Sequence, residues 1–131
     1  MSKVNVFTAK RKTTVARGVI EQGDGSVYIN SKSLDAYNDK LFKMMVTEPI
    51  ILSGDTYKKY SFKIFVTGGG NMARATAVRA VIAKALSSKE KSLRKVFLSY
   101  DRTLLVDDKR VTEPQKPYRS AARALKQTSY R

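Results

Sequence analysis

The sequence predicts an α+β domain followed by an extended basic arm, and three observations support this fold class. Segments rich in β-branched and aromatic residues, bounded by turn residues, occur early in the chain and again at residues 57–66. A long helical pattern begins directly after three consecutive glycines. From residue 107 onward, charged residues and prolines replace the apolar periodicity. We therefore divide the chain into a globular α/β domain, residues 1–106, and an extended basic C-terminal arm, residues 107–131.

Composition restricts the classes of partner. The 131 residues include 26 Lys and Arg against 11 Asp and Glu, a formal net charge of +15 at pH 7. Such self-repulsion is tolerated when a polyanion neutralises it, so nucleic acid or an anionic membrane is the expected partner. We expect no membrane partner, because no apolar run approaches the roughly 18 residues of a membrane span and the start of the chain does not resemble a signal peptide.

The chain contains no cysteine and no histidine. Thiolate chemistry, the usual general base and the commonest metal ligand are therefore missing. We accordingly expect no metal, no cofactor and no enzymatic activity. The lack of cysteine is compatible with a reducing compartment such as the cytoplasm.

The first β-rich segment, residues 4–20, is interrupted by three consecutive cations, Lys10, Arg11 and Lys12. Because side chains alternate along a strand, three successive cations can share one side only at a bulge or a turn. We interpret the triplet as phosphate-binding, with hydroxyl donors added by Thr13 and Thr14. A solvated hairpin tip and a nuclear-import signal are the alternatives.

The middle of the chain contains a predicted turn, strand and helix. Residues 22–26 (QGDGS) have the composition of a hairpin turn, from which a strand at residues 27–30 is expected to return. Between residues 33 and 47 the apolar period indicates a short helix, which Pro49 is expected to end. The residues expected on its buried face are Leu34, Tyr37, Leu41, Met44 and Met45. Residues 18–55 are locally acidic, so we expect this region to face away from a polyanion.

A strand at residues 57–66 is followed by Gly68, Gly69 and Gly70 and a helix at residues 72–86. The expected buried stripe of this helix is Met72, Ala75, Val78, Val81, Ile82 and Ala85, with Arg74, Arg79 and Lys84 off the stripe. Glycines before a helix N-terminus suit a phosphate, which meets free backbone amides and the helix dipole. Because the P-loop and G-x-G-x-x-G patterns are absent, a contact with an RNA phosphate is favoured over a nucleotide site. A purely structural tight turn is the other alternative.

A second helix is predicted after residue 86. Ser87 and Glu90 match a capping box that would open it. Its expected buried face consists of Leu93, Val96, Phe97 and Tyr100. The adjacent Asp107 and Asp108 are expected to shape a turn, with magnesium binding as the alternative.

The arm carries regularly spaced cations, and Pro114 and Pro117 favour an extended backbone at its start. Tyr118 and Tyr130 lie among these charges. This pattern is typical of an arm laid along a polyanion, with guanidinium groups on phosphates and rings on bases. A solvated, disordered tail is the alternative.

Four segments together carry a resemblance to a known family. KRKTTVARG (10–18), GDGSVYIN (23–30), TGGGNMARATAVRAVIAKAL (67–86) and YDRTLLVDDKRVTEPQKPYRSA (100–121), with a final SYR, resemble the universal small-subunit ribosomal protein nine family in its archaeal and eukaryotic branch. The resemblance implies an α+β two-layer sandwich of the ribosomal S-five domain-two-like kind, with a left-handed βαβ crossover.

The resemblance also implies a function: a structural constituent of the small ribosomal subunit, in the cytoplasm. The body would bind rRNA in the head of the subunit, beside neighbouring head proteins. The arm would reach the anticodon arm of the tRNA in the peptidyl site (P site) through Arg131, supported by Ser129 and Tyr130. Thr128 stands where this branch commonly has a lysine.

The alternatives are a non-ribosomal RNA-binding protein and a small-molecule kinase of related fold. The residues expected to bind rRNA are Lys10, Arg11, Lys12, Thr13, Arg17, Gly68, Gly69, Gly70, Arg74, Arg79, Lys109, Arg110, Lys116, Arg119, Arg123 and Lys126.

Overall fold

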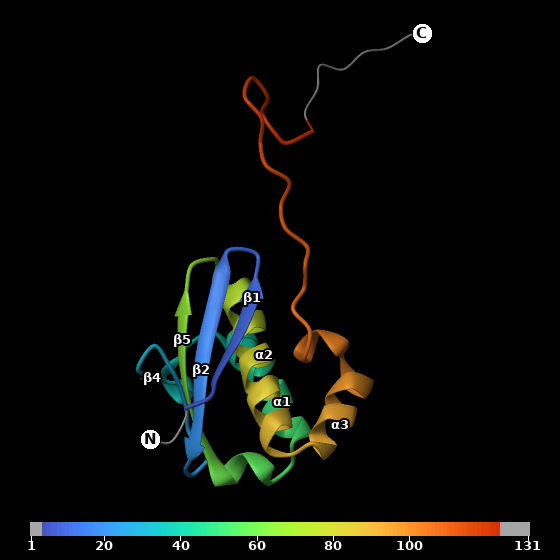
Figure 1. The fold of residues 1–131 in the computed structure, drawn as a ribbon. Coiled ribbons are helices and arrows are strands. Elements are labelled where there is room, and N and C mark those ends of the chain that lie inside the picture. The colour runs from blue at the N-terminus through green and yellow to red at the C-terminus, as the bar shows by residue number, and fades with distance from the viewer. Residues whose placement is uncertain (1–3, 124–131) are drawn as a thin grey trace.

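The computed structural model describes residues 4–123 and confirms the α+β class. Its mixed five-stranded sheet has the strand order β1-β2-β5-β3-β4, and three helices lie against one face of it (Figure 1). The strands are β1 (Val6–Arg11), β2 (Thr14–Gln22), β3 (Val27–Ile29), β4 (Lys32–Ser33) and β5 (Tyr60–Thr67). The helices are α1 (Lys40–Leu52), α2 (Asn71–Lys89) and α3 (Ser92–Tyr100).

β1 and β2 form a tight antiparallel hairpin, which confirms the turn expected at the three cations. Arg11 pairs with Thr14, so the turn consists of Lys12 and Thr13. Lys12 takes a left-handed backbone conformation, with φ at 54°. The side chains of Lys10, Lys12 and Thr13 are all exposed around this turn.

The prediction that residues 22–26 form a hairpin between β2 and β3 is wrong. β5 lies between these two strands, antiparallel to β2 and parallel to β3. The turn instead crosses the start of β5: the N–H of Gly23 donates to the Lys59 carbonyl at 3.1 Å, and the N–H of Gly25 to the Tyr60 carbonyl at 2.8 Å. A side chain at Gly23 would come within 2.4 Å of the Ser61 Cβ, so the close crossing requires glycine here.

The predicted strand at residues 57–66 is confirmed as β5, which begins at Tyr60. Phe62, Ile64 and Val66 are buried on the helix side, and the residues between them face outward. β5 lies in the centre of the sheet, where its backbone pairs with β2 on one side and with β3 on the other. The local composition of the turn carries no information about a strand inserted some forty residues later.

α1 differs from the prediction in its extent and in its buried face. Asp39 caps the helix by accepting hydrogen bonds from the N–H groups of Leu41 and Phe42. The helix continues through Pro49, and its buried residues are Phe42, Val46, Pro49 and Ile50. Leu41 and Met44 are exposed, and Leu34 and Tyr37 precede the helix. Burial of the Pro49 ring offsets the roughly 3 kcal/mol that an interior proline costs.

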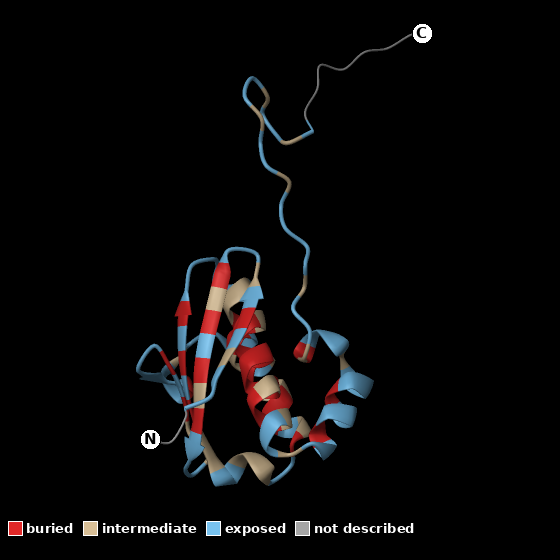
Figure 2. Cartoon of the chain, viewed as in Figure 1, coloured by how far each residue is buried: buried red, intermediate tan, exposed pale blue. Residues whose placement is uncertain are grey.

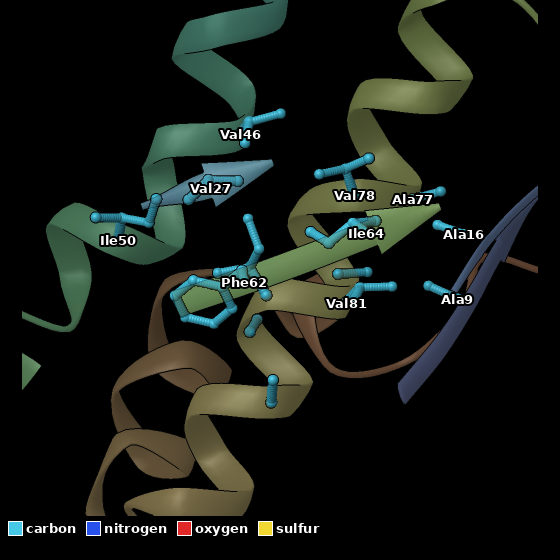
Figure 3. Close-up of a cluster of buried hydrophobic side chains, with 14 of the residues drawn as sticks. Ala9, Ala16, Val27, Val46, Ile50, Phe62, Ile64, Ala77, Val78 and Val81 are labelled. Atoms are coloured by element: carbon cyan, nitrogen blue, oxygen red, sulfur yellow. The ribbon is translucent and has the colours of Figure 1, made fainter. Parts of the chain in front are cut away.

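α2 is the centre of the helical layer and is buried almost all round (Figure 2). The predicted stripe is confirmed except for Met72, which is exposed. Val78 and Val81 pack toward Phe62 and Ile64 of β5, while Ala9 and Ala16 supply small side chains from the hairpin (Figure 3). At Gly18 an added Cβ would lie 2.5 Å from Val81 Cγ1, so glycine allows α2 to approach the sheet closely.

The capping box predicted to open the second helix is wrong. α2 continues to Lys89, and the Ser87 hydroxyl donates to the Lys84 carbonyl at 3.0 Å instead of capping. A serine in a helical turn makes this back-bond when its own helix continues. α3 buries Leu93 and Phe97 as predicted, whereas Val96 and Tyr100 are exposed.

A candidate nucleic-acid interface

The β1–β2 turn and the glycine loop meet at one end of the domain. The Thr14 hydroxyl donates to the Gly68 carbonyl at 3.2 Å, and Arg74 Nε donates to the same oxygen at 3.0 Å. Because Thr14 is buried, the prediction that its hydroxyl is offered to a phosphate is wrong. The structure thus brings together most of the body residues that the sequence marked as phosphate-binding. We call this surface the basic pole, which comprises Lys10, Arg11, Lys12, Thr13, Gly68, Gly69, Gly70 and Arg74.

Two of the three glycines are needed for this close approach. Gly68 and Gly69 have φ values of 76° and 68°, which favour glycine. A Cβ at Gly69 would lie 1.7 Å from the Thr14 Oγ1, and one at Gly68 would lie 2.7 Å from the Thr13 carbonyl oxygen. The tight turn itself therefore requires glycine at these two positions, and this requirement fixes the geometry of the pole.

Gly70 has a different role, because a Cβ there would meet nothing within 4 Å and its φ is −92°. It precedes α2 as the N-cap, and in the described part of the chain no side chain caps this helix. The amides of the first turn of α2 therefore lie at the pole, where the helix dipole favours an anion. The nearby Asp39 carboxylate accepts a hydrogen bond from the Asn71 side chain at 2.6 Å and marks the acidic edge of the surface.

The start of the arm is held by Arg11 of β1 and by Lys84 of α2, which also contacts β1. Arg11 Nη1 donates to the Arg110 carbonyl at 2.9 Å, and its Nε lies 3.8 Å from Asp108. The Lys84 ammonium donates to the Thr8 carbonyl at 2.7 Å and to Asp107 at 2.9 Å. We call these contacts the arm latch. Arg11 therefore acts in this structure by holding the arm beside the basic pole.

The Asp108 carboxylate accepts the Arg110 N–H at 2.9 Å, but the backbone at Asp107 and Asp108 does not form the predicted turn. Hydrogen bonds from the side chain and backbone of Arg110 hold the pKa of Asp108 well below its ordinary value. Within residues 4–123 no group of three or more metal-ligating side chains occurs. Asp107 pairs with Lys84, and Asp108 pairs with Arg110 and Arg11.

Beyond the latch, the described arm extends away from the body and past the end of the sheet that carries the β1–β2 turn (Figure 1). Lys109 and Arg110 are exposed at its start, and Tyr118 is fully exposed further on. Glu113 pairs with Lys116 and with Arg123, both at 2.6 Å. Hydrogen bonds from these two cations hold the pKa of Glu113 below its ordinary value. Arg119 offers its carbonyl to the Gln115 side chain.

Two predicted RNA-binding arginines lie away from the pole. Arg17 is exposed on the face of the sheet that the helices leave open. Arg79 is buried, with 9% of its surface exposed, so the prediction that it lies off the buried face of the helix is wrong. The Arg79 guanidinium donates to Glu48 at 2.7 Å and to Asp101 at 2.8 Å. The helical pattern placed Arg79 off the apolar stripe, but α1 and α3 cover the flanks of α2.

Burial opposes ionisation of Asp101, yet hydrogen bonds from Thr103 and Arg79 outweigh it and hold the pKa of that carboxyl below its ordinary value. The ion pairs of Arg79 with Glu48 and with Asp101 join α1 and α2 to the turn that precedes the arm.

Lys126, Ser129, Tyr130 and Arg131 lie outside the described residues, so their predicted roles stay predictions.

The sequence interpretation missed the arm latch, because Thr8, Lys84 and Asp107 are far apart along the chain and only the fold brings them together. It also missed Phe65, although the alternation in β5 already places this side chain on the outward face. None of the helices in residues 4–123 combines the length and apolarity needed to cross a bilayer.

Comparison with known proteins gives a consistent result. The family model described as ribosomal protein S9/S16 matches residues 9–131. Two archaeal proteins, each named small ribosomal subunit protein uS9, come from Methanococcus vannielii and from Methanococcus maripaludis strain C7. Each is 41% identical to this chain over 133 residues, an alignment that covers 98% of the chain and 99% of the relative. The matched region includes the basic pole, the arm latch and the arm, and the chain therefore belongs to the ribosomal protein S9/S16 family.

Proposed function

We propose that this protein is a structural component of the small ribosomal subunit, which binds rRNA in the head through its basic pole and its arm. Family membership makes the chain a ribosomal protein and not an enzyme. The observation that carries the proposal is the arrangement of the pole: exposed cations, free helix-terminal amides and the start of the arm converge on one end of the domain. From the acidic segment 18–55, Asp39 reaches the edge of this surface, where it accepts a hydrogen bond from Asn71.

The chemistry of the pole matches an RNA backbone. Lys10 and Lys12 present mobile point charges, and the amides before α2 can donate to phosphate oxygens. Lys109 and Arg110 continue the positive surface into the arm. These groups contact phosphates and read no bases, so shape and charge govern recognition by the pole.

The arm adds a second contact in the proposal, with the anticodon arm of the P-site tRNA. In the family that the sequence resembles, the final arginine meets tRNA phosphates, which assigns this role to Arg131 with Ser129 and Tyr130. A guanidinium can bind a phosphate bidentately, which a lysine cannot do. The described arm supports this assignment by leaving the body in an extended form instead of packing back on it.

We also infer the finer features of the fold from the resemblance. β3 and β5 are parallel neighbours, and the chain crosses from one to the other through α1. We infer that this βαβ crossover is left-handed, as in the fold of the ribosomal S-five domain-two-like kind. Such a hand is an exception to the usual right-handed rule. An experimental structure in which the crossover is right-handed would contradict this assignment.

The direct test of the pole is the salt dependence of RNA binding. The double variant Lys10→Ala, Lys12→Ala removes two exposed cations and leaves Arg11 in the latch. Its affinity for small-subunit rRNA should fall, and the log–log salt slope should flatten by about 1.4–1.8. The matched control is Lys59→Ala, Lys91→Ala. These exposed lysines lie just before β5 and just after α2, at the ends of these elements that are remote from the glycine loop. Equal slopes for the two double variants would contradict a localised interface.

A further inference from the structure

The face of the sheet opposite the helices carries a hollow of about 560 Å³. Its lining comes from four strands and includes Val6, Arg17, Val19, Tyr28, Lys63 and Phe65. This volume lies within the range of about 300–1,000 Å³ that is typical of ligand sites. The hollow is distinct from the basic pole, whose residues do not line it.

The strand register determines how the side chains are arranged. Val6, Val19, Lys63 and Tyr28 form one row across the sheet, because Val6 pairs with Val19, Val19 with Lys63, and Lys63 with Tyr28. In the next row Arg17 pairs with Phe65. Since alternate residues of a strand share a face, the two rings lie diagonally across β3 and β5, with a cation beside each.

The framework around the rings is rigid. The Asn30 side chain donates to the Val66 carbonyl at 3.2 Å and accepts the Val66 N–H at 2.8 Å, which continues the pairing of β3 with β5 beyond the last strand residue. The Asn30 N–H also donates to the Ile64 carbonyl at 2.8 Å. These bonds hold the backbone on both sides of Phe65, so the ring projects from a fixed position.

The side chains of the hollow combine exposed rings with positive charge. Phe65 is 61% exposed and Tyr28 is 40% exposed, which is unusual for aromatic rings in the middle of a sheet. Two cations, Arg17 and Lys63, line the hollow, and its described lining contains no carboxylate. Lys63 also pairs with Glu21 at 3.2 Å, outside the lining. The charge therefore favours an anionic occupant, and the rings favour one with flat apolar faces.

We propose that this hollow is a base-stacking site for an unpaired RNA segment, with bases on Phe65 and Tyr28 and phosphates at Arg17 and Lys63. The proposal rests on the proposed function, because it assumes an RNA partner. It adds a second mode of contact, since the basic pole recognises backbone while the hollow recognises exposed bases. Aromatic side chains on an open sheet stack bases in this way, and each stacked base is worth about 1–3 kcal/mol.

The test uses the full chain and an eight-nucleotide oligouridylate, with an abasic oligonucleotide of equal length as the second probe. Phe65→Leu and Tyr28→Leu keep apolar bulk and remove the ring. Each variant should bind the oligouridylate about 5- to 150-fold more weakly, the fold-change that corresponds to that stacking energy. The salt slope should stay unchanged, because no cation is removed. Binding of the abasic probe should be the same in the variants and in the unaltered chain.

Tyr100→Leu is the matched control, since Tyr100 is exposed on α3 and away from the sheet face. Equal binding by the Phe65 and Tyr28 variants and by this control would overturn the stacking site. The proposed function would survive that outcome provided that the Lys10, Lys12 double variant still loses affinity. Failure of the unaltered chain to bind RNA would instead reject both proposals.

A photo-crosslinking residue at position 65, in chain assembled into small subunits, identifies the occupant directly. Crosslinks to RNA support the proposal. Crosslinks to a protein, or none at all, contradict it.

Discussion

At the scale of single residues, the geometry of the basic pole depends on Gly69. Gly69→Ala would place a methyl group on the Thr14 side chain at a position whose φ is 68°. We expect a loss of at least about 1–3 kcal/mol in the free energy of unfolding from the backbone conformation alone. Gly70→Ala is the comparison, because its Cβ would meet open space and its φ is negative. Its loss should be smaller, about 0.5–1 kcal/mol, because alanine is less favourable than glycine at an N-cap. Urea denaturation measures both, and equal midpoints would contradict the close approach of the glycine loop to the hairpin.

Substitution of Arg79 distinguishes a structural role of this side chain from a role in RNA binding. Its two carboxylate partners, Glu48 and Asp101, are 31% and 39% exposed at their side chains. Arg79→Met leaves both carboxylates without this partner, and solvent reduces the full cost of a broken buried pair. We expect the free energy of unfolding to fall by about 1–3 kcal/mol and the salt slope of RNA binding to stay unchanged. A flatter salt slope of RNA binding, with no loss in the free energy of unfolding, would show that Arg79 contacts RNA and would contradict the structural role.

At the scale of elements, the latch orients the arm. Lys84→Met removes the contacts from α2 to the Thr8 carbonyl and to Asp107, so the start of the arm should detach from β1 more often. Limited trypsin digestion should then cut after Lys109 and Arg110 faster than in the unaltered chain. Lys89→Met, an exposed lysine of the same helix, should not change the rate. Identical rates in the two variants would show that the latch does not hold the arm.

The elements also show what the sequence can and cannot predict. β5 and α2 were predictable because their apolar patterns are long and regular. The position of β5 between β2 and β3 was not predictable. The turn residues around Gly23 suit a direct β2–β3 hairpin equally well as a sheet in which a third strand lies between the two. The face of α1 was misassigned because the pattern was started at Leu34, which precedes the helix and shifts every later position.

The candidate site likewise contains residues that the sequence predicts and residues that only the fold reveals. Lys10, Lys12 and the glycines are local signals, and the fold gathers them at one pole. Arg79 carries the same charge and yet is buried, because burial depends on how α1 and α3 pack beside α2. The latch at Lys84 had no local signal, since its partners are separated by most of the chain.

At the scale of the whole molecule, the protein is a compact anchor from which a charged arm extends. A net charge of +15 spread over a small domain and an extended arm is favourable only beside a polyanion. In our account the pole and the latch keep the body on rRNA and set the direction of the arm. In the same proposal, the end of the arm contacts the P-site tRNA.

The most direct test of this division is the dissociation of tRNA from the P site of small subunits that carry the chain without Ser129, Tyr130 and Arg131. We predict that the shortened chain remains in the subunits at its usual amount, because its anchor is intact. tRNA should leave about 10-fold faster or more, since hydrogen bonds to a charged group contribute about 1.5–3 kcal/mol. Unchanged dissociation of tRNA, or loss of the shortened chain from the subunits, would contradict the account.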